Sequence, residues 1–289
     1  MKGIILAAGA GSRLYPATFP ISKTLIPIYD RPMIYYPLSI LMMAGIRDVL
    51  IIVSERELDN FKRTLGDGSQ FGISIEYDIQ YVQRGISDAF IIAEKWIGDE
   101  KVSLILGDNI FYGDNIEQLI EEAANNETGA TIFGYSVPDP KRFGVIGFDD
   151  KMNVTSLEEK PSEPKSNYVA VGLYLYDNKV CSFAKTLEPS KRGELEITDL
   201  NSIYLKNNEL SVKLFDNETK WIDAGTFDSL LESSLFVANE EKKKSEKILC
   251  PEVIAYKKGF VTKNQILNWI SKNKANEYFL DAKKMIENL

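Results

Sequence analysis

The first half of the chain alternates short apolar runs with segments of helical periodicity, and this alternation limits the fold more than any other feature. Apolar runs with the length and β-branched content of buried strands lie at residues 3–8, 48–54, 73–79 and 102–106. Helical patterns fall between them at residues 33–44, 55–65 and 87–96. Strands that alternate with helices pair in parallel and are joined by right-handed crossovers. The sequence therefore predicts an α/β protein with a Rossmann-like sheet flanked by helices.

The rest of the chain changes character twice. Strand-like segments follow at residues 144–148, 154–158 and 169–176, and Asp149-Asp150 after the first of them is typical of a hairpin turn. Helical patterns then occupy residues 231–244, 263–271 and 276–289. We therefore expect a core over residues 1–240 with a mixed sheet. A β-rich insertion at about residues 135–225 would pack against this core, and a helical appendage would follow over residues 241–289.

The residue types present exclude several kinds of chemistry. The chain has no histidine, which excludes Ser-His-Asp and Cys-His catalysis and histidine-ligated metals. Its two cysteines, Cys181 and Cys250, match neither a zinc spacing nor a disulfide framework, and we expect buried, reduced thiols. Any catalysis must therefore rest on carboxylates, Lys, Arg, backbone amides or a hard cation.

Charge and hydropathy limit the partners. The formal net charge is -8, from 34 basic and 42 acidic residues, whereas nonspecific binding of nucleic acid needs a surplus of Lys and Arg. The apolar run near the N-terminus, at residues 4–6, is far too short for a signal peptide or a membrane span. We expect a cytoplasmic protein with no nucleic acid and no membrane as partners. A local basic cluster would still suffice for a small phosphorylated ligand.

The run LAAGAGSRL at residues 6–14 directly follows the first predicted strand. Small residues let backbone amides approach a ligand and cradle its phosphates, and ligands bind at the strand ends of parallel sheets. The dinucleotide fingerprint expects a third glycine where Leu14 stands, and the loop has no Walker Gly-Lys-Ser/Thr. Arg13 favours a triphosphate, while a tight turn between strand and helix is the alternative explanation of the glycines alone.

Three charged residues beyond this loop are candidates for phosphate and metal binding. Lys23 precedes an apolar Leu-Ile-Pro run, which favours a functional orientation over a solvated one. Asp108 follows a predicted buried strand, and Asp223 lies in the segment WIDAGT. One or two carboxylates, with phosphates and waters, complete a Mg²⁺ site, so this pair would suffice. A helix cap or a turn is the alternative role for each aspartate.

A second charged motif, Glu159-Lys160, ends a predicted strand just before Pro161. Strand alternation sends these two side chains to opposite faces unless the proline disturbs it. Taken alone, the motif also fits a solvated ion pair.

Together these motifs resemble the nucleoside-diphosphate-sugar pyrophosphorylases, and most closely their thymidylyltransferase branch. The resemblance spans residues 3–260 and is carried by LAAGAGSRLYP, SKTLIPIYDRPMIYYPLS, LGDNIFYG, RFGVIGFD, LEEKP, RGELEITDLN, WIDAGTFDSLLESS and IAYKKGF. The LAAGxGxR loop marks the superfamily, whereas GDNIFYG, GELEITD and IAYKKGF are specific to the branch.

The resemblance implies a role for each matching position. It places the nucleotide against Leu6, Ala8, Gly9, Ala10, Gly11, Gln80, Gly85 and Asp108, with Gln80 hydrogen-bonded to thymine. It places the sugar phosphate against Gly144, Glu159, Lys160, Val171, Gly172, Tyr174 and Arg192. It gives catalytic roles to Arg13, Lys23, Lys160 and Asp108, and the Mg²⁺ ion to Asp108 and Asp223.

The implied reaction is attack by a phosphate oxygen of glucose 1-phosphate on the α-phosphorus of dTTP, giving dTDP-glucose and pyrophosphate. The attacking phosphate is already anionic near neutral pH, so no general base is needed, which agrees with the absence of histidine. Catalysis then reduces to positioning and charge stabilisation. The alternatives are the same chemistry with UTP or another sugar 1-phosphate, and a noncatalytic nucleotide-sugar sensor. A nicotinamide-dependent dehydrogenase is a further alternative, but this chain has Leu14 where that class has the third glycine of its loop.

The sequence departs from the branch pattern at several places. Residues 81–84 (YVQR) replace a proline-containing loop beside the base, and Val171 stands where threonine is common. Thymine and uracil differ by one methyl group, worth about 1–3 kcal/mol in a pocket. The resemblance implies a homotetramer whose C-terminal tails form a regulatory nucleotide site between subunits. In that tail, Val253 replaces an acidic residue and Lys257 replaces an arginine.

Overall fold

The structure is a computed structural model that describes residues 1–126, 128–273 and 276–289. Its strands are β1 Lys2–Leu6, β2 Pro27–Ile28, β3 Arg31–Pro32, β4 Asp48–Val53, β5 Ser74–Ile79, β6 Val102–Leu106, β7 Asn109–Tyr112, β8 Ala130–Ser136, β9 Gly144–Phe148, β10 Val154–Glu159, β11 Tyr168–Tyr176, β12 Leu210–Leu214 and β13 Lys220–Asp223. Its helices are α1 Tyr35–Met43, α2 Leu58–Leu65, α3 Asp88–Ile92, α4 Glu94–Ile97, α5 Ile116–Ala124, α6 Val180–Ala184, α7 Ile197–Lys206, α8 Phe227–Lys244, α9 Pro251–Lys257, α10 Lys263–Lys272 and α11 Glu277–Asn288.

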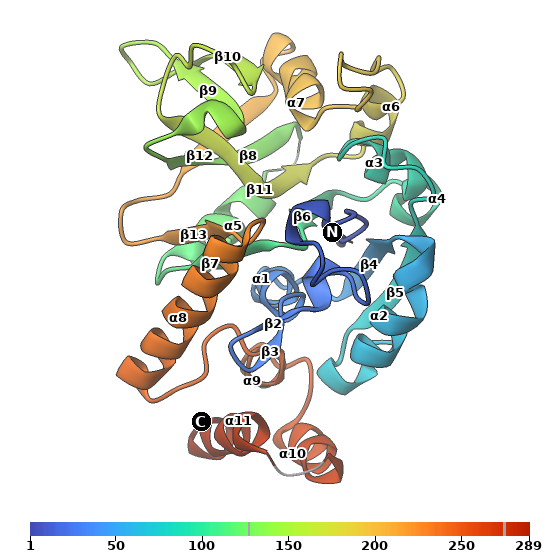
Figure 1. Ribbon diagram of the computed structural model, residues 1–289, viewed down its shortest axis with the longest axis vertical. Helices are drawn as coiled ribbons and strands as arrows, with labels where there is room; N and C mark the ends of the chain where they lie inside the picture. Colours follow the sequence, from blue (N-terminus) through green and yellow to red (C-terminus); the bar gives the residue numbers. More distant parts are fainter. Residues whose placement is uncertain (127, 274–275) are drawn as a thin grey trace.

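A nine-stranded mixed sheet forms the centre of the molecule (Figure 1). Its order is β10-β9-β11-β6-β1-β4-β5, and β8 pairs with both β11 and β12. The pairs β1·β4, β1·β6 and β4·β5 are parallel, which confirms the parallel strands predicted for the first half. The central strand β11 is antiparallel to β6, so the sheet is mixed, as expected.

The strands of the β-rich insertion join this same sheet. The nine-residue strand β11 is long enough to serve both regions. Its second half pairs with β6 of the parallel region, while Val169 in its first half pairs with Val145 of β9. The predicted hairpin between β9 and β10 is present. Backbone hydrogen bonds therefore connect the parallel strands β6, β1, β4 and β5 with the strands of the insertion in one sheet.

Helices cover both faces of the parallel region, which explains the buried apolar runs of its inner strands β1 and β4, whereas β5 at the end of the sheet alternates buried and exposed residues. Ile5 of β1 belongs to one buried cluster with Leu38 of α1. Its neighbour Ile4 points to the other face and belongs to a second cluster with Phe90 of α3. Both isoleucines are fully buried. A strand buried on both faces has no polar alternation, so its ends are what remain for function.

The predicted helix over residues 87–96 is wrong in detail. Two short helices, α3 and α4, meet at Ala93, where φ is -82° and ψ is 0°. Ala93 is the C-cap of α3 and the N-cap of α4, so one helix ends and the next begins there. The other predicted helices are present with shifted ends, and the segment at 55–65 begins as a 3₁₀ turn before α2.

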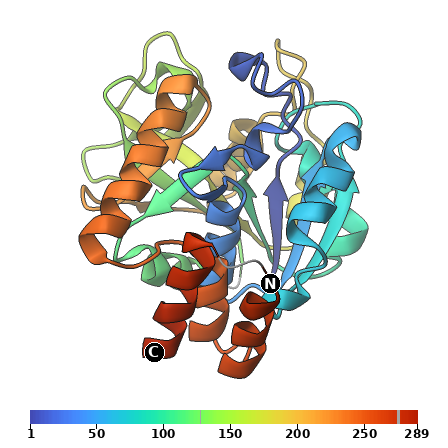
Figure 2. The ribbon, with the colours of Figure 1, turned by 60° about the horizontal axis from the view of Figure 1, so that its bottom comes forward.

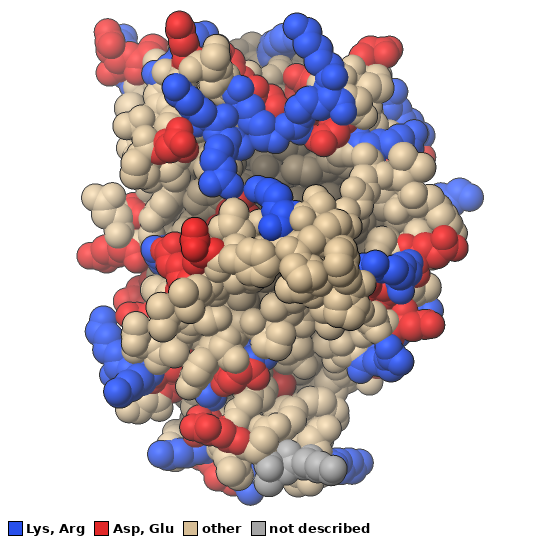
Figure 3. Space-filling model, in the orientation of Figure 1, with Lys and Arg blue, Asp and Glu red and all other residues tan. Residues whose placement is uncertain are grey.

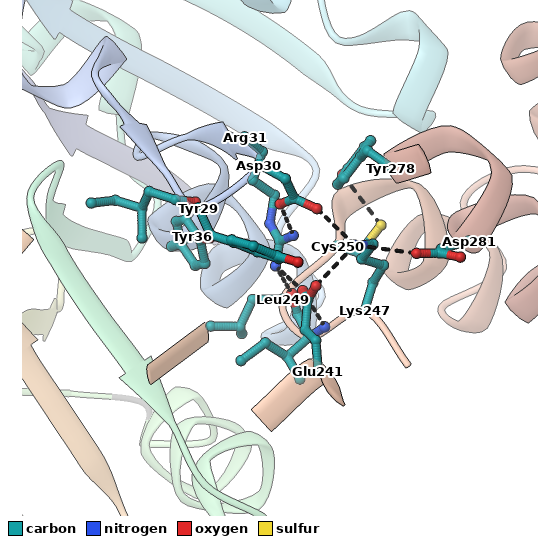
Figure 4. Close-up of polar contacts among 12 residues, drawn as sticks. Tyr29, Asp30, Arg31, Tyr36, Glu241, Lys247, Leu249, Cys250, Tyr278 and Asp281 are labelled. Atoms are coloured by element: carbon teal, nitrogen blue, oxygen red, sulfur yellow. Dashed lines mark hydrogen bonds and ion pairs between the residues drawn. The ribbon is translucent and has the colours of Figure 1, made fainter. Parts of the chain in front are cut away.

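The helices α9, α10 and α11 pack together below the sheet, and Figure 2 shows them at the end of the molecule that carries the C-terminus. A buried ion network fastens them to the core (Figure 4). Arg31 of β3 contacts Glu241 of α8 at 2.6 Å, and Lys247 contacts both Glu241 and Asp281 of α11, at 3.0 and 3.3 Å. Among the described residues, the helices include none that is long and apolar enough to cross a membrane.

Candidate active site

A cleft of about 600 Å³ lies at the carboxyl ends of β1, β5 and β6, between the parallel region and the insertion. Figure 3 shows this side of the molecule hollowed in its upper half, with Lys and Arg side chains gathered around the hollow. The residues from the sequence analysis that line it are Leu6, Gly9, Arg13, Gln80, Gly85, Asp108, Gly144, Glu159, Lys160, Gly172, Tyr174, Arg192 and Asp223. Folding thus brings most of the expected nucleotide, sugar and metal residues to one place.

The loop after β1 is shaped by Gly11, which adopts the left-handed conformation at φ +63°. Its carbonyl oxygen accepts a hydrogen bond from Thr18 Oγ1 at 2.8 Å. A Cβ at Gly11 would lie 3.1 Å from the Thr18 methyl group and 3.3 Å from Lys23 Cβ. Gly9, by contrast, has open space where a Cβ would be. The loop therefore exposes backbone at Gly9 while Gly11 packs against the segment that carries Lys23.

The two candidate metal ligands meet through strand pairing. Asp223 ends β13 opposite Asn109 of β7, which immediately follows Asp108. Lys23 forms an ion pair with Asp108 Oδ2, and Asn109 Nδ2 donates to Asp108 Oδ1 at 2.9 Å. Ala224 N donates to the Asp108 carbonyl oxygen at 2.9 Å, which ties the two strand ends together.

The electrostatics of this pair favour a bound cation. Burial opposes ionisation of Asp108, but the charge and hydrogen bond of Lys23 and the hydrogen bond from Asn109 outweigh it, so its pKa is lowered. Burial, and then the negative charge of Asp108, raise the pKa of Asp223. Two carboxylates that repel one another in a buried cleft suit a hard, oxygen-binding cation. Within the described residues, the structure has no cluster of three or more metal-binding side chains, so this would be a two-carboxylate site.

The part of the cleft where the resemblance places the base is built by the segment at residues 80–88. Gly85 has a φ of +103°, and a Cβ there would lie 2.6 Å from the Leu195 carbonyl oxygen and 2.8 Å from its nitrogen. Leu195 N in turn donates to the Arg84 carbonyl oxygen at 2.6 Å. Only glycine permits this approach. The close contact joins the base end to the segment that carries Arg192.

The part of the cleft where the resemblance places the sugar phosphate centres on Glu159. Its Oε2 accepts a hydrogen bond from Thr198 Oγ1 at 2.5 Å, and Arg192 lies 3.8 Å from its Oε1. Gly144 lies beside this pair, since a Cβ there would be 2.7 Å from Thr198 Oγ1. Burial, and then the charge of Glu159, raise the pKa of the Tyr174 hydroxyl, which keeps it a neutral hydrogen-bonding group.

The comparisons with known proteins agree with this geometry. A family model described as nucleotidyl transferase matches residues 2–240. This chain belongs to the nucleotidyl transferase family.

Similar members of the nucleotidyl transferase family cover nearly the whole chain. A glucose-1-phosphate thymidylyltransferase of Neisseria gonorrhoeae is 52% identical over 92% of each chain, and one of Mycolicibacterium smegmatis is 47% identical over 92% of each. A solved structure described as a Bacillus anthracis glucose-1-phosphate thymidylyltransferase in complex with sucrose has a TM-score of 0.76 at 44% identity, covering 82% of this chain and 94% of that one. A UDP-glucose pyrophosphorylase structure, with a TM-score of 0.71 at 24% identity, shares the fold. Enzymes of this family generally use a divalent metal.

Several expected residues do not line the cleft. Val171 is fully buried in the hydrophobic core, because alternation along β11 turns it away from Gly172 and Tyr174. Its side chain therefore does not form the sugar pocket. Ala8, Ala10, Gly11 and Lys23 are also absent from the lining, although Lys23 reaches the site through Asp108.

Glu159 and Lys160 face the same cleft, so the proline exception to alternation applies. Lys160 has a φ of +45° and has left the extended conformation, while its backbone N–H donates to the Phe143 carbonyl oxygen at 3.0 Å.

Among the polar groups of this site that the sequence analysis missed, Asn109, Thr198 and Arg142 matter most for its geometry and charge. Asn109 Oδ1 accepts hydrogen bonds from Gly172 N at 3.2 Å and from Trp221 Nε1 at 2.7 Å. Asn109 therefore links the residue beside Asp108 to strands β11 and β13. Thr198 orients Glu159, and Arg142 adds a further positive charge to the lining. Asn109 was the easiest of these to find, because it directly follows Asp108 at the end of a strand.

Proposed function

We propose that this chain transfers a thymidylyl group from dTTP to glucose 1-phosphate and releases pyrophosphate. The observation that carries the proposal is the set of glucose-1-phosphate thymidylyltransferases at 43–52% identity that cover most of the chain. The cleft supports it independently, because the same cleft is lined by the carboxylates of Asp108 and Asp223 and by Glu159 with Arg192.

In the proposed reaction, a phosphate oxygen of glucose 1-phosphate forms a new bond to the α-phosphorus of dTTP. The bond between the α-phosphorus and the bridging oxygen breaks, and pyrophosphate leaves with the electron pair. Arg13 and Lys23 would neutralise the triphosphate, and Lys160 and Arg192 would hold the sugar phosphate. No residue has to remove a proton, because the nucleophile is already an anion. The work of the chain is positioning and charge stabilisation.

We propose Mg²⁺ as the divalent metal, held by Asp108 and Asp223. Their oxygens are the ligands that Mg²⁺ prefers, and one or two protein carboxylates are typical of its sites on nucleotides. The ion would supply positive charge at the phosphates. The ion pair between Lys23 and Asp108 orients the carboxylate that the metal needs.

The decisive experiment is a matrix of nucleoside triphosphates against sugar 1-phosphates, with pyrophosphate release as the readout. We expect the highest kcat/KM with dTTP and glucose 1-phosphate, and loss of activity with EDTA that Mg²⁺ restores. Asp108→Asn should lower kcat by about 10²–10³-fold, as loss of one electrostatic contact does. Asp114→Asn, at an exposed carboxylate paired only weakly with Lys244, is the matched control. Higher activity with UTP or another sugar would replace the substrate assignment, and ligand binding without turnover would indicate a sensor.

We also propose that residues 241–289 make the contacts of a homotetramer and of a regulatory site. A second cleft of about 280 Å³ lies where α9 meets α1 and α5, and Val253 and Lys257 line it. Phe227, Leu231 and Leu235 on the neighbouring helix α8 are 51, 61 and 55% exposed. An apolar stripe of this kind marks an interface. Light scattering after size exclusion tests the assembly: a monomer at micromolar concentration would contradict it.

A further inference from the structure

The orientation of one amide at the base end of the cleft is set by a residue that does not line the cleft. Gln80 lines the cleft, and its Nε2 donates to Asp88 Oδ2 at 3.0 Å and to the Gly85 carbonyl oxygen at 3.3 Å. Both partners only accept hydrogen bonds, so they hold the nitrogen side of the amide. Gln80 Oε1 has no partner within residues 1–126, 128–273 and 276–289, and it is not sealed from solvent. The side chain therefore presents an acceptor to the cleft.

Asp88 is itself held in place. Its side chain is 2% exposed, and its Oδ1 accepts a hydrogen bond from Arg84 at 2.6 Å. The residue before it, Ser87, donates its hydroxyl hydrogen to the Glu196 carbonyl oxygen at 3.1 Å, which anchors the start of α3. A carboxylate offers acceptors on both oxygens, so rotation of Asp88 cannot present a donor to Gln80.

We propose that Asp88 is a positioning residue that sets base selectivity by holding the carbonyl oxygen of Gln80 toward the nucleotide. The inference rests on the proposed function, in which the base lies at this end of the cleft. An acceptor there suits a pyrimidine that carries an N–H at ring position 3, as thymine and uracil do. Cytosine carries an unprotonated nitrogen at that position, so two acceptors would face each other and both would stay unpaired. A reversed amide would have the opposite preference, and Asp88 excludes it.

The test compares kcat/KM for dTTP and dCTP in Asp88→Asn and in the unaltered enzyme. In the variant, Arg84 takes the amide oxygen at position 88, so the amide nitrogen there faces Gln80. Gln80 then turns its own oxygen toward that nitrogen, gives up its longer hydrogen bond to the Gly85 carbonyl oxygen, and presents its nitrogen to the base. We expect the unaltered enzyme to prefer dTTP by about 10⁴-fold, as sites that hydrogen-bond a substrate do. In the variant this ratio should fall by at least about tenfold, through KM more than kcat.

A second variant tests the same logic in reverse. When Arg84→Ala is added to Asp88→Asn, no guanidinium competes for the amide oxygen at position 88, and that oxygen can again accept from Gln80. The dTTP:dCTP ratio should return toward the unaltered value. Arg84→Ala alone should keep the ratio. Asp78→Asn is the matched control, because Asp78 is an exposed carboxylate at the end of β5 whose side chain bonds Ile79 N.

The outcomes separate this inference from the proposed function. A dTTP:dCTP ratio that Asp88→Asn leaves unchanged overturns the inference, as does an equal loss for both nucleotides, which a purely structural role would give. An unaltered enzyme that accepts dCTP as well as dTTP also overturns it, even if the variants do not fold. No turnover of any nucleotide would contradict the proposed function, and calorimetric titration with dTTP and dCTP would then test the selectivity of binding directly.

Discussion

The ion network beneath the core makes a quantitative prediction about stability. Glu241 sits at its centre: its Oε1 accepts from Arg31 at 2.6 Å and from Ile248 N at 3.1 Å, and its Oε2 contacts Lys247 at 3.0 Å. The side chains of Arg31, Glu241 and Lys247 are only 1, 7 and 6% exposed. Asp30 contacts both cations, at 2.6 and 2.7 Å. The charges alternate in sign, and the two cations and Glu241 have almost no access to water, while Asp30 is 20% exposed.

Glu241→Gln keeps the shape of this side chain and removes its charge. The two buried cations then share Asp30, and the new amide nitrogen faces the Lys247 ammonium group. Breaking a buried ion pair from one side costs about 3–5 kcal/mol. At about 2–4 °C of Tm per kcal/mol, the variant should melt roughly 10 °C lower.

The assay is thermal unfolding followed by circular dichroism, with urea titration to check that the m-value is unchanged. The control is Glu232→Gln, because Glu232 contacts Lys220 at the same distance of 2.6 Å while 54 and 38% of the two side chains are exposed. An exposed pair contributes under about 1 kcal/mol. Equal loss of Tm in the two variants would refute the reasoning that burial gives the network its strength.

Two further predictions concern the base loop and a buried carboxyl. Gly85→Ala should raise KM for the nucleotide by at least about tenfold, because the new methyl group would displace the backbone of Leu195. The control is Gly98→Ala, because Gly98 also has a positive φ but has open space where a Cβ would lie. This variant should lower the free energy of unfolding by about 1 kcal/mol and leave KM unchanged. Parallel effects of the two alanines would contradict the first prediction. Burial raises the pKa of Glu252 above its usual 4.5, so the folded state binds the proton more tightly, and this group's contribution to stability should fall as pH rises from about 4.5 toward the raised pKa. Urea titrations at several pH values should show that Glu252→Gln lacks this decline, and identical slopes in both proteins would show that Glu252 is not its source.

The amino-acid sequence determined the local elements and much of the composition of the site. Residues 49–53 are apolar at every position because helices cover both faces of the strand, so the type of this element was readable without knowledge of its partners. The absence of histidine excluded histidine-dependent catalysis, and the LAAGAGSRL loop with Arg13 favoured phosphate binding. The positions of Arg13, Asp108 and Asp223 near strand ends made them candidates.

Only the tertiary structure decided which candidates meet and which way they face. The pairing of β13 with β7 brings Asp223 beside Asp108, and pairing register between distant segments is not written in either segment alone. The placement of β11 in the sheet turns Val171 into the core, and the positive φ of Lys160 turns that side chain into the cleft. The direction of the Gln80 amide depends on Asp88, since the choice between two ends of an amide is made by its neighbours in space. Sequence periodicity is local, whereas pairing register and hydrogen-bond direction are fixed by contacts between residues far apart in the chain.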